Sequence, residues 1–263
     1  MLINKCIILA AGLSTRLYPA TKVIPKPMFP IYDTPIIQIL VEQVKAAGIT
    51  DIAIVTHSIT DLIEEHFLPN VELERELKAK GKDDLAKQVN DMVPGVNITF
   101  FKQVIPGAAG ALITTKEWLN EEPFLLLYCD EVIFEEHLPK FLNSYNGNHL
   151  IFSTKRPASE APNYGTIIAD ENSRAIKIQE KVPVTDRDTV DIVLGKSILN
   201  YNIFEAIDKL EKDHVGELVL TNAIGLDLEN IPVYIHKTNY EVFDTGNADG
   251  YLDACIAYKN ISK

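Results

Sequence analysis

Short apolar segments alternate with helical patterns over the first 130 residues, and this alternation restricts the possible folds more than any other feature. Residues 5–9 and 52–55 are apolar runs of strand length. Between them, apolar residues recur at helical spacing after Thr34 and Pro35, up to Gly48. Parallel strands need such crossover helices, which cover both faces of the sheet. The pattern predicts an α/β fold with a Rossmann-like, mainly parallel central sheet flanked by helices.

The rest of the chain continues this pattern and then changes it. We expect, in order, a helix at 59–67, a charged helical excursion at 71–92 interrupted at Gly81, a strand at 97–102, a helix at 108–119 and a strand at 124–129. After residue 157 the predicted elements are strands at 166–169, 175–180 and 192–198, a helix at 202–212, a strand at 233–236 and a closing helix after Ala248. These shorter, alternating strands predict a smaller mixed α/β lobe. We therefore predict one domain over residues 1–263, in which residues 1–156 and residues 157–263 share a sheet and flank one cleft.

The charge balance excludes one large class of partners. The net charge of −12 gives a field that repels DNA and RNA, so no nucleic-acid partner is expected and any phosphate ligand needs a local basic site. No signal-peptide pattern or apolar run of bilayer length occurs, so we expect a cytoplasmic protein without a membrane partner. The three cysteines are far apart in the sequence and predict reduced, buried thiols.

Two segments near the N-terminus carry basic side chains suited to phosphate. The turn after the first strand, LAAGLSTR at 9–16, has small residues that let backbone amides approach a ligand, and it ends at Arg16. PKPM at 25–28 holds Lys26 between two prolines. Alone, each segment is equally compatible with an ordinary turn bearing a solvated cation. The glycine spacings of a Walker loop and of a dinucleotide fingerprint are missing, which argues against a nicotinamide-dependent dehydrogenase.

Together, these two motifs resemble the signature of the bacterial sugar-1-phosphate nucleotidyltransferases. Within that superfamily the chain looks most like the UTP–glucose-1-phosphate uridylyltransferases, on the evidence of PATKVIPK at 19–26, AAGIT at 46–50, VTHS at 55–58 and the charged insertion that follows. The resemblance extends from about residue 3 to residue 258. It implies the nucleotide-diphospho-sugar transferase fold, in which residues 1–156 bind the nucleotide and residues 157–263 bind the sugar and close the site.

The resemblance also implies roles for individual residues. Arg16 and Lys26 would bind the triphosphate and Lys181 would neutralise the attacking phosphate, which makes these three the predicted catalytic residues. The predicted nucleotide-binding residues are Ala10, Ala11, Gly12, Gln103 and Gly107. The Gln103 amide, which offers a donor and an acceptor together, would read a uracil or thymine edge. The predicted sugar-binding residues are Tyr164, Gly165, Glu180 and Gly195. Asp130 and Asp244 would bind Mg²⁺, the one expected cofactor.

The reaction implied is transfer of the uridylyl group of UTP to glucose 1-phosphate, giving UDP-glucose and pyrophosphate without a covalent enzyme intermediate. A homo-oligomer, either a dimer or a tetramer, is expected from the same resemblance. Three positions depart from the family pattern: Ser14 replaces a glycine, Val182 replaces a proline, and Asn222 replaces an aspartate. Two alternatives therefore stay open, namely the same chemistry with dTTP or another sugar phosphate, and a catalytically silent sugar-nucleotide-binding protein.

Overall fold

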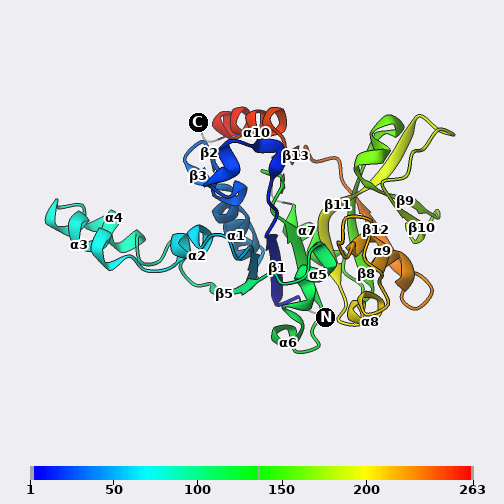
Figure 1. Cartoon of the computed structure of the whole chain (residues 1–263), viewed down its shortest axis with the longest axis horizontal. Helices are drawn as coiled ribbons and strands as arrows, with labels where there is room; N and C mark the ends of the chain where they lie inside the picture. The colour runs from blue at the N-terminus through cyan, green and yellow to red at the C-terminus, as the bar shows by residue number, and fades with distance from the viewer. Residues whose placement is uncertain (1–2, 136, 262–263) are drawn as a thin grey trace.

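A nine-stranded sheet runs through the molecule, with helices packed on both of its faces (Figure 1). The computed structural model describes residues 3–135 and 137–261. The strands of this sheet are β1 (Lys5–Ala10), β4 (Asp51–Thr56), β5 (Asn97–Lys102), β6 (Phe124–Tyr128), β8 (His149–Pro157), β9 (Gly165–Ala169), β10 (Ala175–Glu180), β11 (Thr189–Leu199) and β12 (Val233–Lys237). Their order is β10-β9-β11-β6-β1-β4-β5, and β8 pairs with both β11 and β12.

The strand directions divide this sheet at β6. The strands β6, β1, β4 and β5 are mutually parallel, so their carboxyl ends meet at one edge. Beyond β6 the sheet is mixed, because β11 runs antiparallel to β6, β8 and β9, whereas β12 is parallel to β8. The predicted Rossmann-like fold with a mixed second lobe is confirmed. In such sheets the edge formed by the carboxyl ends of the strands is where ligands bind.

Two small two-stranded sheets and ten α-helices are also present among the described residues. The small sheets are β2 (Pro30–Ile31) with β3 (Thr34–Pro35), and β7 (Glu131–Val132) with β13 (Phe243–Asp244). The helices are α1 (Ile36–Ala46), α2 (Leu62–Phe67), α3 (Val71–Ala79), α4 (Asp83–Gln88), α5 (Ala108–Ile113), α6 (Lys116–Leu119), α7 (Leu138–Asn143), α8 (Ile203–Ile207), α9 (Leu220–Asp227) and α10 (Ala248–Ile261). The 3₁₀ turns are η1 (Thr15–Leu17), η2 (Ala20–Lys22), η3 (Lys26–Met28) and η4 (Ala158–Asn163).

The core consists of two apolar layers separated by the sheet. Successive residues of β1 point to opposite faces, so Ile8 joins a cluster with side chains of α1 and α7, while Ile7 joins a cluster with side chains of α5, α8 and α9. Both isoleucines are completely buried. Burying such a side chain stabilises the fold by about 1.5–3 kcal/mol, so the central strand fixes the helices on both faces.

Several predicted helix boundaries were wrong, each for a local reason. The helix predicted at 108–119 breaks at Thr114 and Thr115, whose hydroxyls donate to the carbonyls of Ala111 and Leu112. The helix at 59–67 begins only at Leu62. Pro35 precedes α1 instead of forming its first residue, because it pairs with β2 as part of β3.

Other elements were mispredicted or not predicted. The helix expected at 202–212 ends at Ile207, and α7, α9 and β8 were not predicted. The charged excursion does form two helices, α3 and α4, broken at Gly81, which has a left-handed φ of 69°. These helices project away from the sheet (Figure 1). Among residues 3–135 and 137–261, no helix has the length and apolar character required to cross a bilayer.

Candidate active site

The first wall of the site is the loop that follows the central strand. Ala10 and Ala11 are buried where β1 ends, and Gly12 faces open space, where an added Cβ would meet no atom. Ser14 adopts the left-handed conformation with φ 50° and ψ 45°, and η1 then presents Arg16 to solvent. An L-residue in this conformation costs about 1–2 kcal/mol, which explains the usual glycine here. Ser14 thus keeps the geometry that glycine would adopt.

Lys26 is buried beside the end of the neighbouring strand β6. It begins η3 directly after the extended Pro25, and only 6% of the residue is exposed. Its Nζ lies 3.6 Å from Oδ2 of Asp130. Because an isolated buried ammonium is unfavourable, this contact with a carboxylate explains its position. The simpler interpretation of Lys26 as a solvated surface lysine is therefore wrong.

The two predicted metal-binding aspartates are brought together by pairing between distant segments. β7, which follows Asp130, pairs with β13, in which Asp244 lies opposite Glu131. The backbone N–H of Thr245 donates to the carbonyl of Asp130 at 2.8 Å. Oδ2 of Asp244 lies 3.7 Å from Nη1 of Arg16. Each aspartate therefore has its own cationic neighbour, Lys26 for Asp130 and Arg16 for Asp244.

Gln103 follows β5 and holds the adjacent loop through its side chain. Its Nε2 donates to the carbonyl of Ile105 at 2.8 Å and to that of Gly107 at 2.9 Å. Both amide hydrogens are consumed, so the expectation that this amide offers a donor and an acceptor together is wrong. The acceptor Oε1 makes no hydrogen bond within the part of the chain that the structure describes, and it is the atom left for a ligand. Gly107 has a φ of 92°, and an added Cβ would lie 2.3 Å from the carbonyl oxygen of Leu218, so a side chain is excluded.

Three of the predicted sugar-binding residues, Tyr164, Gly165 and Glu180, lie at the start of β9 and the end of β10, next to Lys181. Gly165 is the register partner of Glu180, and the backbone N–H of Lys181 donates to the carbonyl of Tyr164 at 3.0 Å. Oε2 of Glu180 is buried and has no hydrogen-bond partner among the described residues. A buried acceptor left unsatisfied is costly, which favours a ligand hydroxyl as its partner. The Lys181 Nζ is exposed and lies 3.6 Å from Oε1 of Glu180.

Gly195 lies in β11 directly against the end of β6. An added Cβ would lie 2.6 Å from Cβ of Tyr128, so only glycine fits. Its backbone N–H donates to Oε2 of Glu131 at 2.6 Å. The next residue, Lys196, is completely enclosed, and its Nζ donates to the backbone carbonyl of Glu131 at 2.9 Å.

These residues surround two adjoining cavities at the edge where the strands end. The first, called the loop cavity, has a volume of about 1070 Å³, and the second, the sheet cavity, of about 530 Å³. The predicted residues in the loop cavity are Ala10, Ala11, Gly12, Arg16, Lys26, Gln103, Gly107, Asp130 and Lys181. Those in the sheet cavity are Arg16, Asp130, Tyr164, Gly165, Glu180, Lys181, Gly195 and Asp244. The structure thus brings every predicted site residue into one of the two cavities, and Arg16, Asp130 and Lys181 line both.

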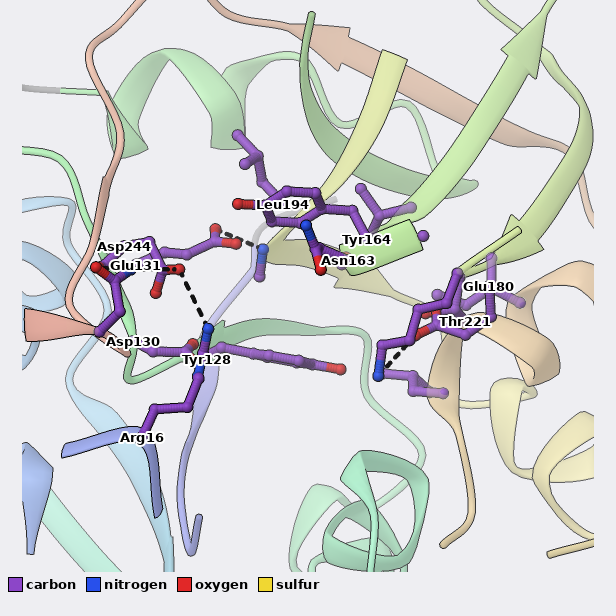
Figure 2. Close-up of a pocket in the computed structure, with 18 residues that line it drawn as sticks. Arg16, Tyr128, Asp130, Glu131, Asn163, Tyr164, Glu180, Leu194, Thr221 and Asp244 are labelled. Atoms are coloured by element: carbon purple, nitrogen blue, oxygen red, sulfur yellow. Dashed lines mark hydrogen bonds and ion pairs between the residues drawn. The ribbon is translucent and has the colours of Figure 1, made fainter. Parts of the chain in front are cut away.

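The sheet cavity has charged groups at both of its ends. Figure 2 shows Asp130, Glu131 and Asp244 near Arg16 at one end, and Glu180 with Thr221 at the other. The side chain of Tyr128 lies between these two groups. A ligand that filled both cavities would therefore pass Asp130, which lines both, and would reach Asp244 in the sheet cavity.

Burial shifts the pKa of several groups near Asp130. Burial raises the pKa of Glu131 to about 7, with Asp130 adding to the rise, although Lys196 and the Gly195 N–H lower it. Burial also lowers the pKa of Lys196. The pKa of the Cys129 thiol is raised to about 12, again mainly by burial. This thiol is a poor nucleophile at neutral pH, in line with the interpretation of Cys129 as core filler.

The residues that line the sheet cavity but were missing from the predicted site include Tyr128, Glu131, Asn163 and Thr221. Three of them are sequence neighbours of predicted residues, because Tyr128 and Glu131 flank Cys129 and Asp130, and Asn163 precedes Tyr164. Their position beside predicted site residues in the sequence could have identified these three. Thr221 directly precedes Asn222, one of the departures from the family pattern, and in the fold its methyl group would lie 2.8 Å from a Cβ added at Gly165.

The fold and the two-cavity site define a class of nucleotide-handling α/β enzymes, and comparison with known families identifies it. The family model for nucleotidyl transferases matches residues 5–260. The chain therefore belongs to the nucleotidyl transferase family, as the sequence motifs predicted.

The resemblance to the uridylyltransferases is confirmed within this family. A UTP–glucose-1-phosphate uridylyltransferase from Staphylococcus haemolyticus is 34% identical to the chain, over 97% of the chain and 92% of the relative. A solved structure of a UTP-bound UGPase from Acinetobacter baumannii is 30% identical and covers 98% of the chain and 93% of its own, with a TM-score of 0.86. A UDP-glucose pyrophosphorylase complexed with UDP-glucose is 26% identical and covers 99% of the chain and 100% of its own, with a TM-score of 0.85.

Proposed function

We propose that the chain transfers the uridylyl group of UTP to glucose 1-phosphate, forming UDP-glucose and releasing pyrophosphate. The observation that carries the proposal is that Asp130 lines both the loop cavity, which contains Gln103, and the sheet cavity, which contains Glu180 and Asp244. The related structures that contain UTP or UDP-glucose support this assignment.

In the proposed reaction, a phosphate oxygen of glucose 1-phosphate attacks the α-phosphorus of UTP in line. The new P–O bond forms while the bond from the α-phosphorus to the oxygen bridging the β-phosphate breaks, and pyrophosphate leaves with that oxygen. Arg16 and Lys26 would bind the triphosphate oxygens, and Lys181 would offset the charge of the attacking phosphate. No nucleophile from the protein is required, and the protonated Cys129 thiol fits that requirement.

The oxygen donors of the sheet cavity suit Mg²⁺, which we propose as the cofactor. Asp130 and Asp244 supply hard oxygen ligands from two segments that the β7–β13 pairing joins. Among the described residues no group of three or more His, Cys, Asp and Glu side chains could hold a metal ion alone. Mg²⁺ commonly binds to one or two carboxylates and takes its other ligands from water and substrate phosphates, so this pair fits. The bound ion would neutralise the charge that develops on the phosphates.

The sugar hydroxyls would be bound by groups around Glu180. Its buried Oε2 has no protein partner among the described residues, so a sugar hydroxyl could donate to it at no cost to the fold. Gly165 and Gly195 leave no room for a side chain, because an added Cβ would lie 2.8 Å from the Thr221 methyl group and 2.6 Å from Cβ of Tyr128, so the cavity wall there is backbone. Together these features support a sugar phosphate as the second substrate.

Pyrophosphate release from UTP and glucose 1-phosphate with Mg²⁺ tests the proposal. We expect steady turnover by the wild-type chain and at least about a 100-fold loss in Asp130→Asn, because the variant loses a carboxylate charge at the proposed metal site. Asp83→Asn on the exposed helix α4 is the matched control and should retain full activity. Absence of turnover with every nucleoside triphosphate and sugar phosphate tried, combined with tight UDP-glucose binding, would instead identify a silent binding protein.

A further inference from the structure

Glu131 and Lys196 form a connection between the two sides of the site that the proposed reaction does not use. Lys196 is among the largest completely buried side chains of the chain, with 1% of its surface exposed. Glu131 is adjacent to Asp130 in the sequence and opposite Asp244 in the β7–β13 pairing. The two residues therefore join the segments that carry the aspartates to strand β11, which carries Gly195.

Two hydrogen bonds make this connection, and they run in opposite directions. The backbone N–H of Gly195 donates to the side chain of Glu131 at 2.6 Å. The side chain of Lys196 donates to the backbone carbonyl of Glu131 at 2.9 Å. Each bond uses an ionisable side chain, and such bonds are shorter and stronger than neutral ones when that side chain is charged. A shift of either segment would break both.

The backbone at Gly195 needs this support because the strand is irregular there. The pairing of β11 with β8 is in register up to Val193 and resumes, shifted, at Ser197. The bonds that would hold a regular strand are therefore interrupted between these residues. On its other side, the described ladder between β11 and β6 begins only at Lys196. The carboxylate of Glu131 takes the place of a strand partner for Gly195.

We propose that Glu131 and Lys196 are positioning residues, which fix the Gly195 segment relative to Asp130 and Asp244 and so align the second substrate with the nucleotide. This inference rests on the proposed function, because alignment has meaning only for a reaction between two bound substrates. Neither residue is assigned a contact with the reacting atoms. Misplacement of about 1 Å in such a site lowers turnover strongly without abolishing binding of the nucleotide.

Two conservative variants of Glu131 separate the effect of side-chain length from the effect of side-chain charge. Glu131→Gln keeps the length of the side chain and an oxygen that accepts from the Gly195 N–H. Glu131→Asp keeps the charge, but its side chain is one methylene shorter and cannot span the same gap. Glu65→Gln and Glu65→Asp on the exposed face of α2 are the matched controls. Lys196→Met removes the second bond.

The measurements are kcat, the KM values for UTP and glucose 1-phosphate, and amide hydrogen exchange of peptides covering residues 193–197. We expect Glu131→Asp to lower kcat on the order of 10- to 100-fold, the loss for one hydrogen bond to a charged group, with the KM for UTP within about twofold of wild type. Glu131→Gln should stay within about fivefold of wild type. Exchange at residues 193–197 should accelerate in Glu131→Asp and in Lys196→Met.

The opposite order, with Glu131→Gln inactive and Glu131→Asp active, would overturn the proposal and indicate that the carboxylate charge itself is needed. Unchanged exchange at residues 193–197 in both Glu131 variants would also overturn it, whatever their activity. Equal impairment of both variants with accelerated exchange would support it, because the bond then depends on its charge. The exchange measurement needs only folded protein, so it remains decisive if the wild-type chain shows no turnover and the proposed function fails.

Discussion

At Gln103, the fold decides which atoms of a bifunctional side chain can recognise a ligand. The two amide hydrogens are donated to the carbonyls of Ile105 and Gly107, so the free group is the acceptor Oε1. Uracil and thymine carry an N3–H that can donate to this oxygen, whereas N3 of cytosine is itself an acceptor. Two acceptors that face each other without a hydrogen repel, so the site should discriminate against cytosine.

We therefore expect UTP to be preferred to CTP by roughly 10- to 100-fold in kcat/KM, which corresponds to about 1–3 kcal/mol for an unmatched buried group. In Gln103→Leu this ratio should fall toward 1, because the acceptor is lost. The ratio of UTP to dTTP should be the same in both proteins, since both bases present the same N3–H. Competition assays with the three triphosphates measure these ratios, and an unchanged UTP-to-CTP ratio in the variant would contradict the assignment.

At the scale of single elements, α7 is preceded by a histidine that burial keeps neutral. His137 precedes Leu138 and is 1% exposed, with its ring against Phe152 and Tyr240. Its Nδ1 is 2.9 Å from the carbonyl of Glu135, and its buried Nε2 has no partner among the described residues. Burial lowers the pKa of His137 to about 4, and the nearby Lys196 contributes to this lowering.

This shift makes the element sensitive to acid. The pKa in the folded chain lies below the ordinary value of about 6.5, so between pH 6.5 and 4 the unfolded chain binds the proton more strongly. The free energy of unfolding should therefore decrease as the pH falls through this window. The variant His137→Phe keeps an aromatic ring without the titrating group. Between pH 7 and pH 5, the free energy of unfolding of the wild type should fall by about 2 kcal/mol more than that of this variant.

Urea unfolding at the two pH values measures this difference. Glu131 acts in the opposite sense, because its raised pKa favours the folded chain at low pH. Since Glu131 is present in both proteins, its contribution cancels in the comparison. Equal losses in wild type and in His137→Phe would contradict the prediction.

At the scale of the whole molecule, the sequence predicted the architecture, and which residues gather around the two cavities, far better than it predicted individual boundaries. Strands such as β1 and β6 are continuous apolar runs that can only be buried, so their positions were predictable. Asp130 was predicted at the end of an apolar strand and Lys26 in a loop held by two prolines, and the family resemblance gave both residues their roles. The break of the helix at Thr114 was not, because a hydroxyl bond to a backbone carbonyl competes weakly with helix formation.

Other features depend on contacts between segments distant in the chain and have no local signature. Glu131 meets Gly195 across 64 residues, and Thr245 meets Asp130 across 115. Both amide hydrogens of Gln103 are donated only because the following loop brings the carbonyls of Ile105 and Gly107 to this side chain. The expected homo-oligomer stays a prediction, and light scattering from the purified chain should give the mass of a dimer or a tetramer.

The pairing of β11 has a consequence for how this enzyme can be divided. That strand is bonded to β6, β8 and β9, so the sheet has no break at which the proposed nucleotide-binding and sugar-binding sides could separate. A fragment ending near residue 156 would leave the side of β6 unpaired, and an open, flat, apolar edge of this kind is a template for aggregation. Neither side can therefore be exchanged as an independent module. New substrate preferences must arise by replacing side chains at the strand ends, on a backbone that both substrates share.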